Sequence, residues 1–200
     1  MFNIQAYKKP LLSAFALGSA AYGAYKLDQN PRILQAAHTQ LVHFANRFRV
    51  VDPSVTSLSL VGHGVSRIDL SRYPNLRKVE LSSNDFRIPP SFAWNPVLEK
   101  VSLTYNGMEI PPSFRWNPSL QEANLSSNNL RELPFLRWSS ALTTLNLSEN
   151  KLSGPIRLNN ASLKTARFSY NSLGITPQVP SGCEVQCYGN PLLNGLGRTK

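Results

Sequence analysis

Apolar residues recur at a regular spacing through most of the chain. Seven aligned units begin at intervals of 20 to 22 residues, at Val55, Leu76, Leu98, Leu120, Leu142, Leu163 and Cys183. Each unit follows the order apolar-x-x-apolar-x-apolar-x-x-Asn-x-apolar, with the last unit degenerate. A repeat of this period predicts a solenoid, in which stacked neighbours bury together the apolar face that no single unit can bury alone.

The fourth and sixth positions of each unit predict a short strand. Both positions are apolar and a polar residue separates them, which is the periodicity of a strand with one buried face. The fourth position holds Leu58, Val79, Val101, Ala123, Leu145 and Ala166, and the sixth holds Leu60, Leu81, Leu103, Leu125, Leu147 and Phe168. We therefore expect one strand per unit, all on the same side of the stack.

The ninth position is asparagine in five successive units, as in "LSSNDF", "LSSNNL" and "LSENKL". An asparagine where a strand turns a corner can hydrogen-bond the backbone of its own unit and of the neighbouring one. Stacked units would then carry a ladder of asparagines that satisfies buried peptide groups. His63 occupies this position in the first unit.

With these units the chain resembles the leucine-rich-repeat family, over roughly residues 55–193. The segment "LNLSENKLSGPI" is similar to the plant-type repeat, and "YGNPLL" resembles the closing segment of some such domains. The resemblance implies an α/β solenoid, mostly β, shaped as a horseshoe with a parallel sheet on its concave side. His63 and the shortened unit at Cys183 fit the atypical capping repeats found at the ends of solenoids.

The convex side is predicted from a second repeated motif, Ile-Pro-Pro-Ser-Phe-x-Trp-Asn-Pro. Diproline excludes α-helix, so we expect loops and short 3₁₀ turns there. One column, formed by Phe92, Phe114, Leu136 and Leu158, should stack inward. The favoured interpretation of a second column, Trp94, Trp116 and Trp138, is that it packs on the back of the solenoid, and a ligand-facing aromatic stripe is the alternative.

The residues before the repeats predict two further segments. Residues 1–27 form an apolar leader in which Lys8 and Lys9 precede an uncharged stretch, and it is interpreted as an export signal or a membrane-associating segment. An unremarkable packing segment or a disordered leader is the alternative. Residues 28–54 predict an amphipathic helix, with Asn30 as N-cap and Pro31 after it, that caps the first unit. Residues 194–200 are expected to be a disordered tail.

Outward positions of the predicted strands form a polar plate with two tyrosines. Because tyrosine and arginine are typical binding anchors, we predict a protein-binding site on this concave face. Its contact residues are Lys78, Glu80, Lys100, Tyr105, Arg167 and Tyr170. The plain alternative is a sheet face that is merely solvated.

The formal net charge of +10 allows nucleic acid, anionic lipid or acidic proteins as partners. No basic helix interleaved with aromatic residues occurs, so we expect no nucleic-acid partner. Cys183 and Cys187 cannot form a zinc pair or a disulfide framework, and a local disulfide or two free thiols both stay open. Asn124, Asn146 and Asn160 each begin a glycosylation sequon.

The sequence shows no catalytic constellation. It has no phosphate-binding glycine loop, His38 and His43 do not share a helix face, and His63 is interpreted as structural. We therefore expect no enzyme activity, no cofactor and no metal. The predicted function is a non-catalytic protein-interaction module, exported or membrane-associated through residues 8–26. A structural scaffold held at a membrane surface by the N-terminal segment and basic charge is the alternative function, and an intracellular location is the alternative to export.

Overall fold

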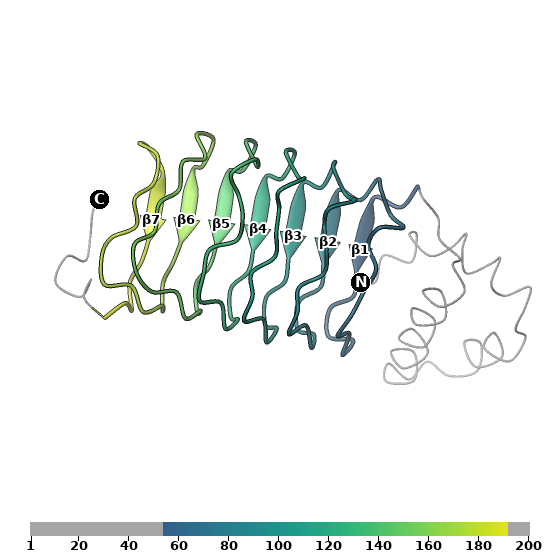
Figure 1. Cartoon of the computed structure of the whole chain (residues 1–200), viewed down its shortest axis with the longest axis horizontal. Coiled ribbons are helices and arrows are strands. Elements are labelled where there is room, and N and C mark those ends of the chain that lie inside the picture. Colours follow the sequence, from purple (N-terminus) through teal and green to yellow (C-terminus); the bar gives the residue numbers. More distant parts are fainter. Residues whose placement is uncertain (1–53, 192–200) are drawn as a thin grey trace, which may run out of the picture.

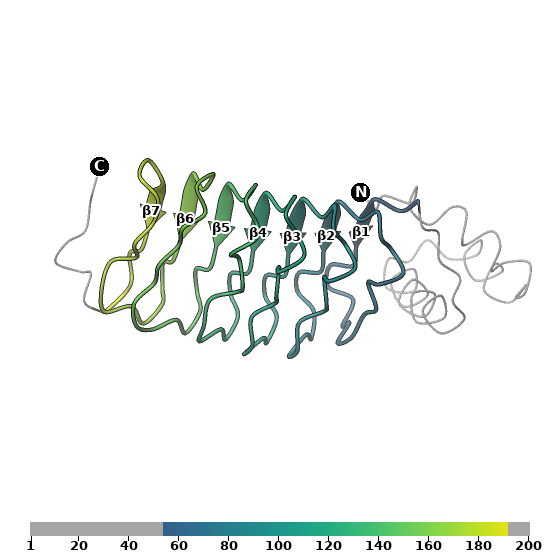
Figure 2. The ribbon, with the colours of Figure 1, turned by 45° about the horizontal axis from the view of Figure 1, so that its top comes forward.

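The computed structural model describes residues 54–191, which form a parallel β-solenoid (Figure 1). The predicted leader, capping helix and tail lie outside this range, except for Ser54. Seven strands make one sheet in chain order: β1 (Ser57–Ser59), β2 (Lys78–Glu80), β3 (Lys100–Ser102), β4 (Glu122–Asn124), β5 (Thr144–Asn146), β6 (Thr165–Arg167) and β7 (Glu184–Gln186). The predicted one-strand-per-unit solenoid is confirmed, and the seven units form a stack that curves only slightly (Figures 1 and 2).

The strand register agrees with the sequence alignment in six units and corrects it in the seventh. Every strand pairs in parallel with the next, position for position, from Ser57 opposite Lys78 onward. In the last pair Thr165 lies opposite Glu184, so the seventh unit begins at Gly182 and not at Cys183. This one-residue shift places Cys187 in the sixth column and Asn190 in the ninth.

A single apolar core runs the length of the stack. The first, fourth, sixth and eleventh columns are buried in the first six units, and so is the predicted inward column on the back. Phe92 and Phe114 stack there with ring centroids 5.4 Å apart. In the seventh unit Val185 and Cys187 are only partly buried against this core. Burial therefore comes almost wholly from contacts between neighbouring units, as the repeat pattern predicts.

The predicted asparagine ladder is present at the ninth position. Asn128 Nδ2 donates to the carbonyl oxygens of Leu103 (2.9 Å) and Leu125 (3.1 Å), and its Oδ1 accepts from the amide of Met108 (3.2 Å). The same three contacts, to the previous unit, its own unit and the previous corner, recur at Asn84, Asn106, Asn150, Asn171 and Asn190. His63 is buried at the start of this row, with its backbone amide donating to Asn84 Oδ1 (3.1 Å).

The back of the solenoid consists of loops closed by i→i+3 hydrogen bonds, which is the expected 3₁₀-type turn. In the second unit, for example, Asn95 N donates to Phe92 O and Leu98 N donates to Asn95 O, both at 3.1 Å. No helix occurs among residues 54–191. These turns return the chain to the start of the next strand.

A second ladder, which the sequence analysis missed, runs along these turns. Asn117 Nδ2 donates to the carbonyl oxygens of Phe92 (3.0 Å) and Asn95 (2.8 Å). Asn95 and Asn160 make the equivalent pair of bonds, whereas Ser139 makes one bond of 3.4 Å, to Phe114 O. The Asn of the repeated Trp-Asn-Pro motif was the available signal. Side-chain amides therefore bond backbone carbonyls at the corner after the strand in six units, and at the turn before the next strand at Asn95, Asn117 and Asn160.

The tryptophan column is exposed, so the favoured interpretation that it packs on the back of the solenoid is wrong. Trp94, Trp116 and Trp138 are 66%, 58% and 53% exposed. The interior at this level is already filled by the Phe92 column two residues earlier, and the buried asparagine ladder follows directly. Between two inward positions the tryptophan has to point to solvent.

Candidate functional site

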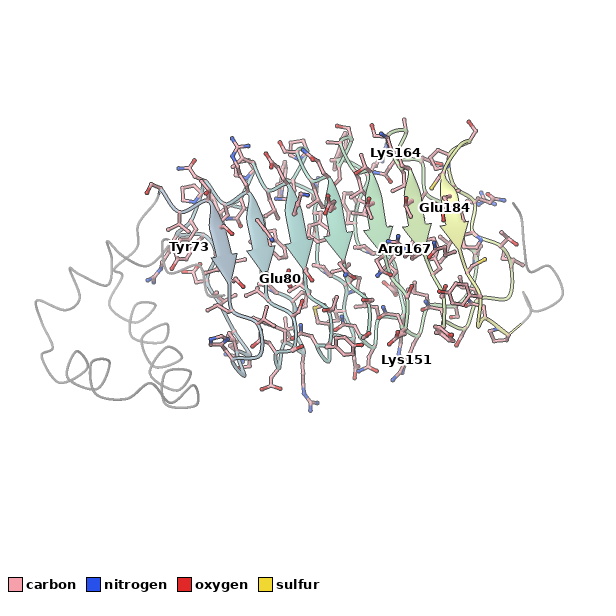
Figure 3. The ribbon with its side chains drawn as sticks, turned by 180° about the vertical axis from the view of Figure 1, so that it is seen from behind. Tyr73, Glu80, Lys151, Lys164, Arg167 and Glu184 are labelled. Carbon is pink, nitrogen blue, oxygen red and sulfur yellow. The ribbon has the colours of Figure 1, made fainter. Side chains whose placement is uncertain are left out.

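The sheet face, defined as the outward side chains of β1 to β7 together with the corner that follows each strand, contains all six predicted contact residues. Lys78 and Lys100 are exposed at the third position, and Glu80 and Arg167 are half-buried at the fifth. Tyr105 and Tyr170 are exposed at the eighth position, at 64% and 58%. Figure 3 shows Glu80 and Arg167 on the sheet beside their strands, with Lys164 and Lys151 at opposite ends of the strands.

The structure divides these residues into two groups along the sheet. Lys78, Glu80, Lys100 and Tyr105 belong to the second and third units, whereas Arg167 and Tyr170 belong to the sixth. With strands about 4.8 Å apart, three units separate the tyrosines by roughly 14 Å. One extended partner can reach both groups, but no single small pocket can.

Side-chain contacts between neighbouring strands fix much of the sheet face. Lys100 Nζ pairs with Glu122 Oε1 at 2.6 Å, and Arg167 Nε donates to Gln186 Oε1 at 3.1 Å. Both pairs lie within one row of the repeat, so each links two adjacent strands. The side chains are therefore held before any partner arrives.

Two of the four serines at the seventh position, directly after the inward sixth position, are buried. Ser82 is 7% exposed and Ser169 is 2% exposed. Ser82 Oγ donates to Glu80 Oε1 (2.5 Å) and lies 2.8 Å from Ser102 Oγ. Ser82 therefore positions the Glu80 carboxylate. The most exposed side chains of the sheet face lie in the third and eighth columns.

The eighth column has left-handed backbone in all seven units. Its φ angles run from 51° to 71°, at Gly62, Ser83, Tyr105, Ser127, Glu149, Tyr170 and Gly189. Glycine adopts this conformation freely, but other residues pay roughly 1 kcal/mol or more. The five non-glycine residues here are therefore strained in place. Their side chains project from the corner at the edge of the sheet face.

Tyr170 is held in position by the last unit. Its ring meets that of Tyr188 edge to face, with centroids 5.6 Å apart. It also lies against the backbone of Gly189, where a β-carbon would come within 2.5 Å of Tyr170 Cδ1. Tyr188 is 62% exposed and was missed by sequence reasoning, because the unit's register was set one residue late. The pair forms an aromatic patch at the C-terminal end of the sheet face.

Two of the three sequons lie on the sheet face and one lies inside the stack. Asn124 and Asn146 are half-buried, with their Oδ1 atoms accepting bonds from the backbone amides of Ser126 and Ser148. Asn160 is 7% exposed and its Nδ2, the atom a glycan would occupy, donates two buried bonds. The folded solenoid therefore does not offer Asn160 for glycosylation.

Cys183 and Cys187 are both free thiols. Burial raises the pKa of each thiol, and the neighbouring Glu184 carboxylate raises the pKa of Cys183 further. Residues 54–191 contain no cluster of three potential metal ligands. Within the same stretch, no helix has the length and apolarity needed to cross a bilayer.

Comparison with known proteins agrees with the fold. A family model described as Leucine Rich Repeat matches residues 141–160. No relative among curated proteins matches the sequence. Among solved structures, the leucine-rich-repeat domain of a Shigella effector is similar at 20% identity and a TM-score of 0.61, covering 87% of this chain and 74% of that one.

Two further structures show the same similarity over a smaller share of their own length. The leucine-rich-repeat domain of APL1B is 23% identical with a TM-score of 0.59, covering 83% of this chain and 56% of that one. InlP from Listeria monocytogenes is 27% identical with a TM-score of 0.55, covering 61% of this chain and 36% of that one. The chain therefore spans between about a third and three quarters of these proteins.

Proposed function

This chain is a leucine-rich-repeat protein, and we propose that it is a non-catalytic module that binds another protein on its sheet face. The fold is a typical protein-interaction scaffold, and proteins of this family are generally non-catalytic binding modules. The proposal places the contacts at Lys78, Glu80, Lys100, Tyr105, Arg167 and Tyr170, and adds Tyr188.

The observation that carries the proposal is the pair of exposed tyrosines in left-handed backbone. Tyr105 and Tyr170 have φ angles of 51° and 56°, where the terminal units carry glycine. The left-handed corner recurs in every unit, and only in these two units does it carry a large aromatic side chain, which is 64% exposed at Tyr105 and 58% exposed at Tyr170. Tyrosine is among the residues that dominate binding energy.

Charge on the sheet face indicates which partner fits the contact residues of the second and third units. Lys78 forms no ion pair with any other residue in the range 54–191, and its register neighbour Lys100 is a second lysine. Lys78, Glu80 and Lys100 on β2 and β3 carry one net positive charge, and Glu122 on the next strand pairs with Lys100. The proposed partner therefore presents acidic residues to Lys78 and apolar or hydrogen-bonding pockets to the tyrosines.

Binding by a rigid face has a thermodynamic advantage. Each of β2 to β6 is fixed by backbone bonds to both neighbours, such as Leu103 N to Asn124 O at 2.9 Å, so little backbone ordering accompanies association. Export or membrane association through residues 8–26 remains a prediction, since those residues lie outside the described range.

The test is quantitative affinity capture with the full chain. The double variant Tyr105→Ala/Tyr170→Ala is compared with the parent and with Ile175→Ala, a matched removal of an exposed apolar side chain that lies away from the sheet face. Loss of a hot-spot tyrosine is expected to weaken binding by about tenfold or more. Partners retained equally by all three proteins would show that the sheet face is not the binding surface.

A further inference from the structure

The turns that lead from the back of the solenoid into the next strand carry a row of exposed aromatic residues. The row, named here the tryptophan row, consists of Trp94, Trp116 and Trp138 in three successive units. Ile88 and Ile110, which are 67% and 61% exposed, add apolar surface in the same units. Exposed apolar groups that recur in successive units indicate a candidate interaction surface.

Arginines are built into the row. Arg115 Cζ lies 5.1 Å from the ring centroid of Trp116, and Arg137 Cζ lies 5.4 Å from that of Trp138. Both contacts are cation–π interactions between adjacent residues. Trp94 follows Ala93 and has no such cation, and it is the most exposed of the three. The row therefore combines indole rings with positive charge at a fixed spacing.

The charge of the back is of one sign. The return segments of the second to sixth units are residues 89–97, 111–119, 133–141, 155–162 and 176–181. Their charged residues are Arg115, Arg137 and Arg157, and none is a carboxylate. The nearest carboxylates in the sequence lie outside these segments: Glu99 is five residues after Trp94, Glu122 is six after Trp116, and Glu132 is six before Trp138. Glu99 and Glu122 pair with Arg77 and Lys100. A partner of complementary charge is therefore anionic.

We propose that the tryptophan row docks on an anionic lipid bilayer surface. Tryptophan prefers the level of the lipid headgroups, because its ring is apolar and its N–H is polar. Arginine next to it attracts negatively charged headgroups. Stacking of nucleic-acid bases fits the geometry less well, because the guanidinium groups already occupy one face of Trp116 and of Trp138. This docking is independent of the sheet face and would leave that face open to a protein.

The chain offers a specific reporter for this proposal. Its three tryptophans are all in the row, so the tryptophan fluorescence of the full chain reports on this surface alone. We expect emission to shift to shorter wavelength, and brominated lipids to quench it, with vesicles of phosphatidylcholine and phosphatidylserine but not with phosphatidylcholine alone. Arg115→Gln and Arg137→Gln should each weaken vesicle binding about fivefold. Lys151→Gln, which removes the same charge at the corner after β5, should weaken vesicle binding much less.

Four results would overturn the proposal. One is vesicle sedimentation of the chain without a change in emission, which would show attachment through another segment. A second is an equal shift with uncharged vesicles, and a third is a shift with single-stranded RNA but not with vesicles. The fourth is emission of the free chain that is already shifted and protected from acrylamide, which would show that a segment of the chain covers the row.

Discussion

The ring of Tyr170 lies so close to the backbone of Gly189 that a β-carbon on residue 189 would come within 2.5 Å of Tyr170 Cδ1. Gly189 also has a φ of 71°, which a side chain disfavours. The last complete turn of the solenoid thus sets the position of an exposed tyrosine in the preceding unit. A C-terminal unit that looks degenerate in sequence is in this way part of the candidate binding surface.

Gly189→Ala is therefore expected to displace the Tyr170 ring and to weaken partner binding as much as Tyr170→Ala does. Its control is Gly182→Ala, where φ is 81° but a β-carbon would have nothing within 4 Å. Both variants have the same conformational penalty of roughly 1 kcal/mol. Near-ultraviolet circular dichroism and partner affinity should change only for residue 189. Equal behaviour of the two variants would show that the contact does not position Tyr170.

Asn128→Ala is expected to destabilise the fold by about 2–4 kcal/mol, because three buried backbone groups lose their partner. Asn129→Ala is the matched control, since its side chain takes no part in the ladder and is half-buried. Urea denaturation followed by far-ultraviolet circular dichroism gives both free energies of unfolding. A difference below about 1 kcal/mol between the variants would argue against the ladder.

Ser139→Asn is expected to stabilise the protein. Ser139 makes one bond of 3.4 Å in the outer ladder, where Asn117 makes two bonds of 3.0 and 2.8 Å. The gain should be about 1 kcal/mol, the net value of one good hydrogen bond. Neighbouring units already accommodate asparagine at this point of the turn. A lower midpoint of urea denaturation than that of the parent would mean that the fourth unit lacks the room its neighbours have.

The thiols of Cys183 and Cys187 should react slowly in the folded chain. Burial raises the pKa of both, so less thiolate is present at a given pH than in the unfolded chain. Because the folded pKa of each thiol lies above its unfolded pKa, the stabilisation from these protonated thiols is complete below the unfolded pKa. The free energy of unfolding then decreases as the pH rises through the folded pKa. Alkylation by iodoacetamide at pH 8 should be slower in buffer than in urea. Faster reaction of the native thiols would contradict the assigned burial.

The columns that the sequence predicted well are those in which one residue type recurs and has one structural role. Leucine at the sixth position packs in the core and asparagine at the ninth hydrogen-bonds the backbone, so the period of the repeat was enough to locate the core and the ladder. The left-handed eighth column was missed because Ser83, Tyr105 and Glu149 give no glycine signal. That conformation is imposed by the turn, which tertiary packing determines.

The errors on the back have a similar cause. Trp94 is the largest side chain in its segment, and size favours burial when neighbours are unknown. In the structure Phe92 and Asn95 take the inward positions, and only two residues lie between them. The register of the last unit depended on one glycine, Gly182, in a place where earlier units have leucine or valine. Tertiary packing sets the pairing of Thr165 with Glu184, and the local sequence does not determine it.

Site-specific photocrosslinking tests the central claim, that the sheet face binds a protein, most directly. A benzophenone amino acid is placed at Tyr105 or Tyr170 on the sheet face, and at Ile110 or Ile175, which are exposed away from it. We predict protein adducts of the same mass from both tyrosine positions and none from the isoleucine positions. Adducts confined to the isoleucine positions, or an absence of protein adducts at both tyrosines, would contradict the account.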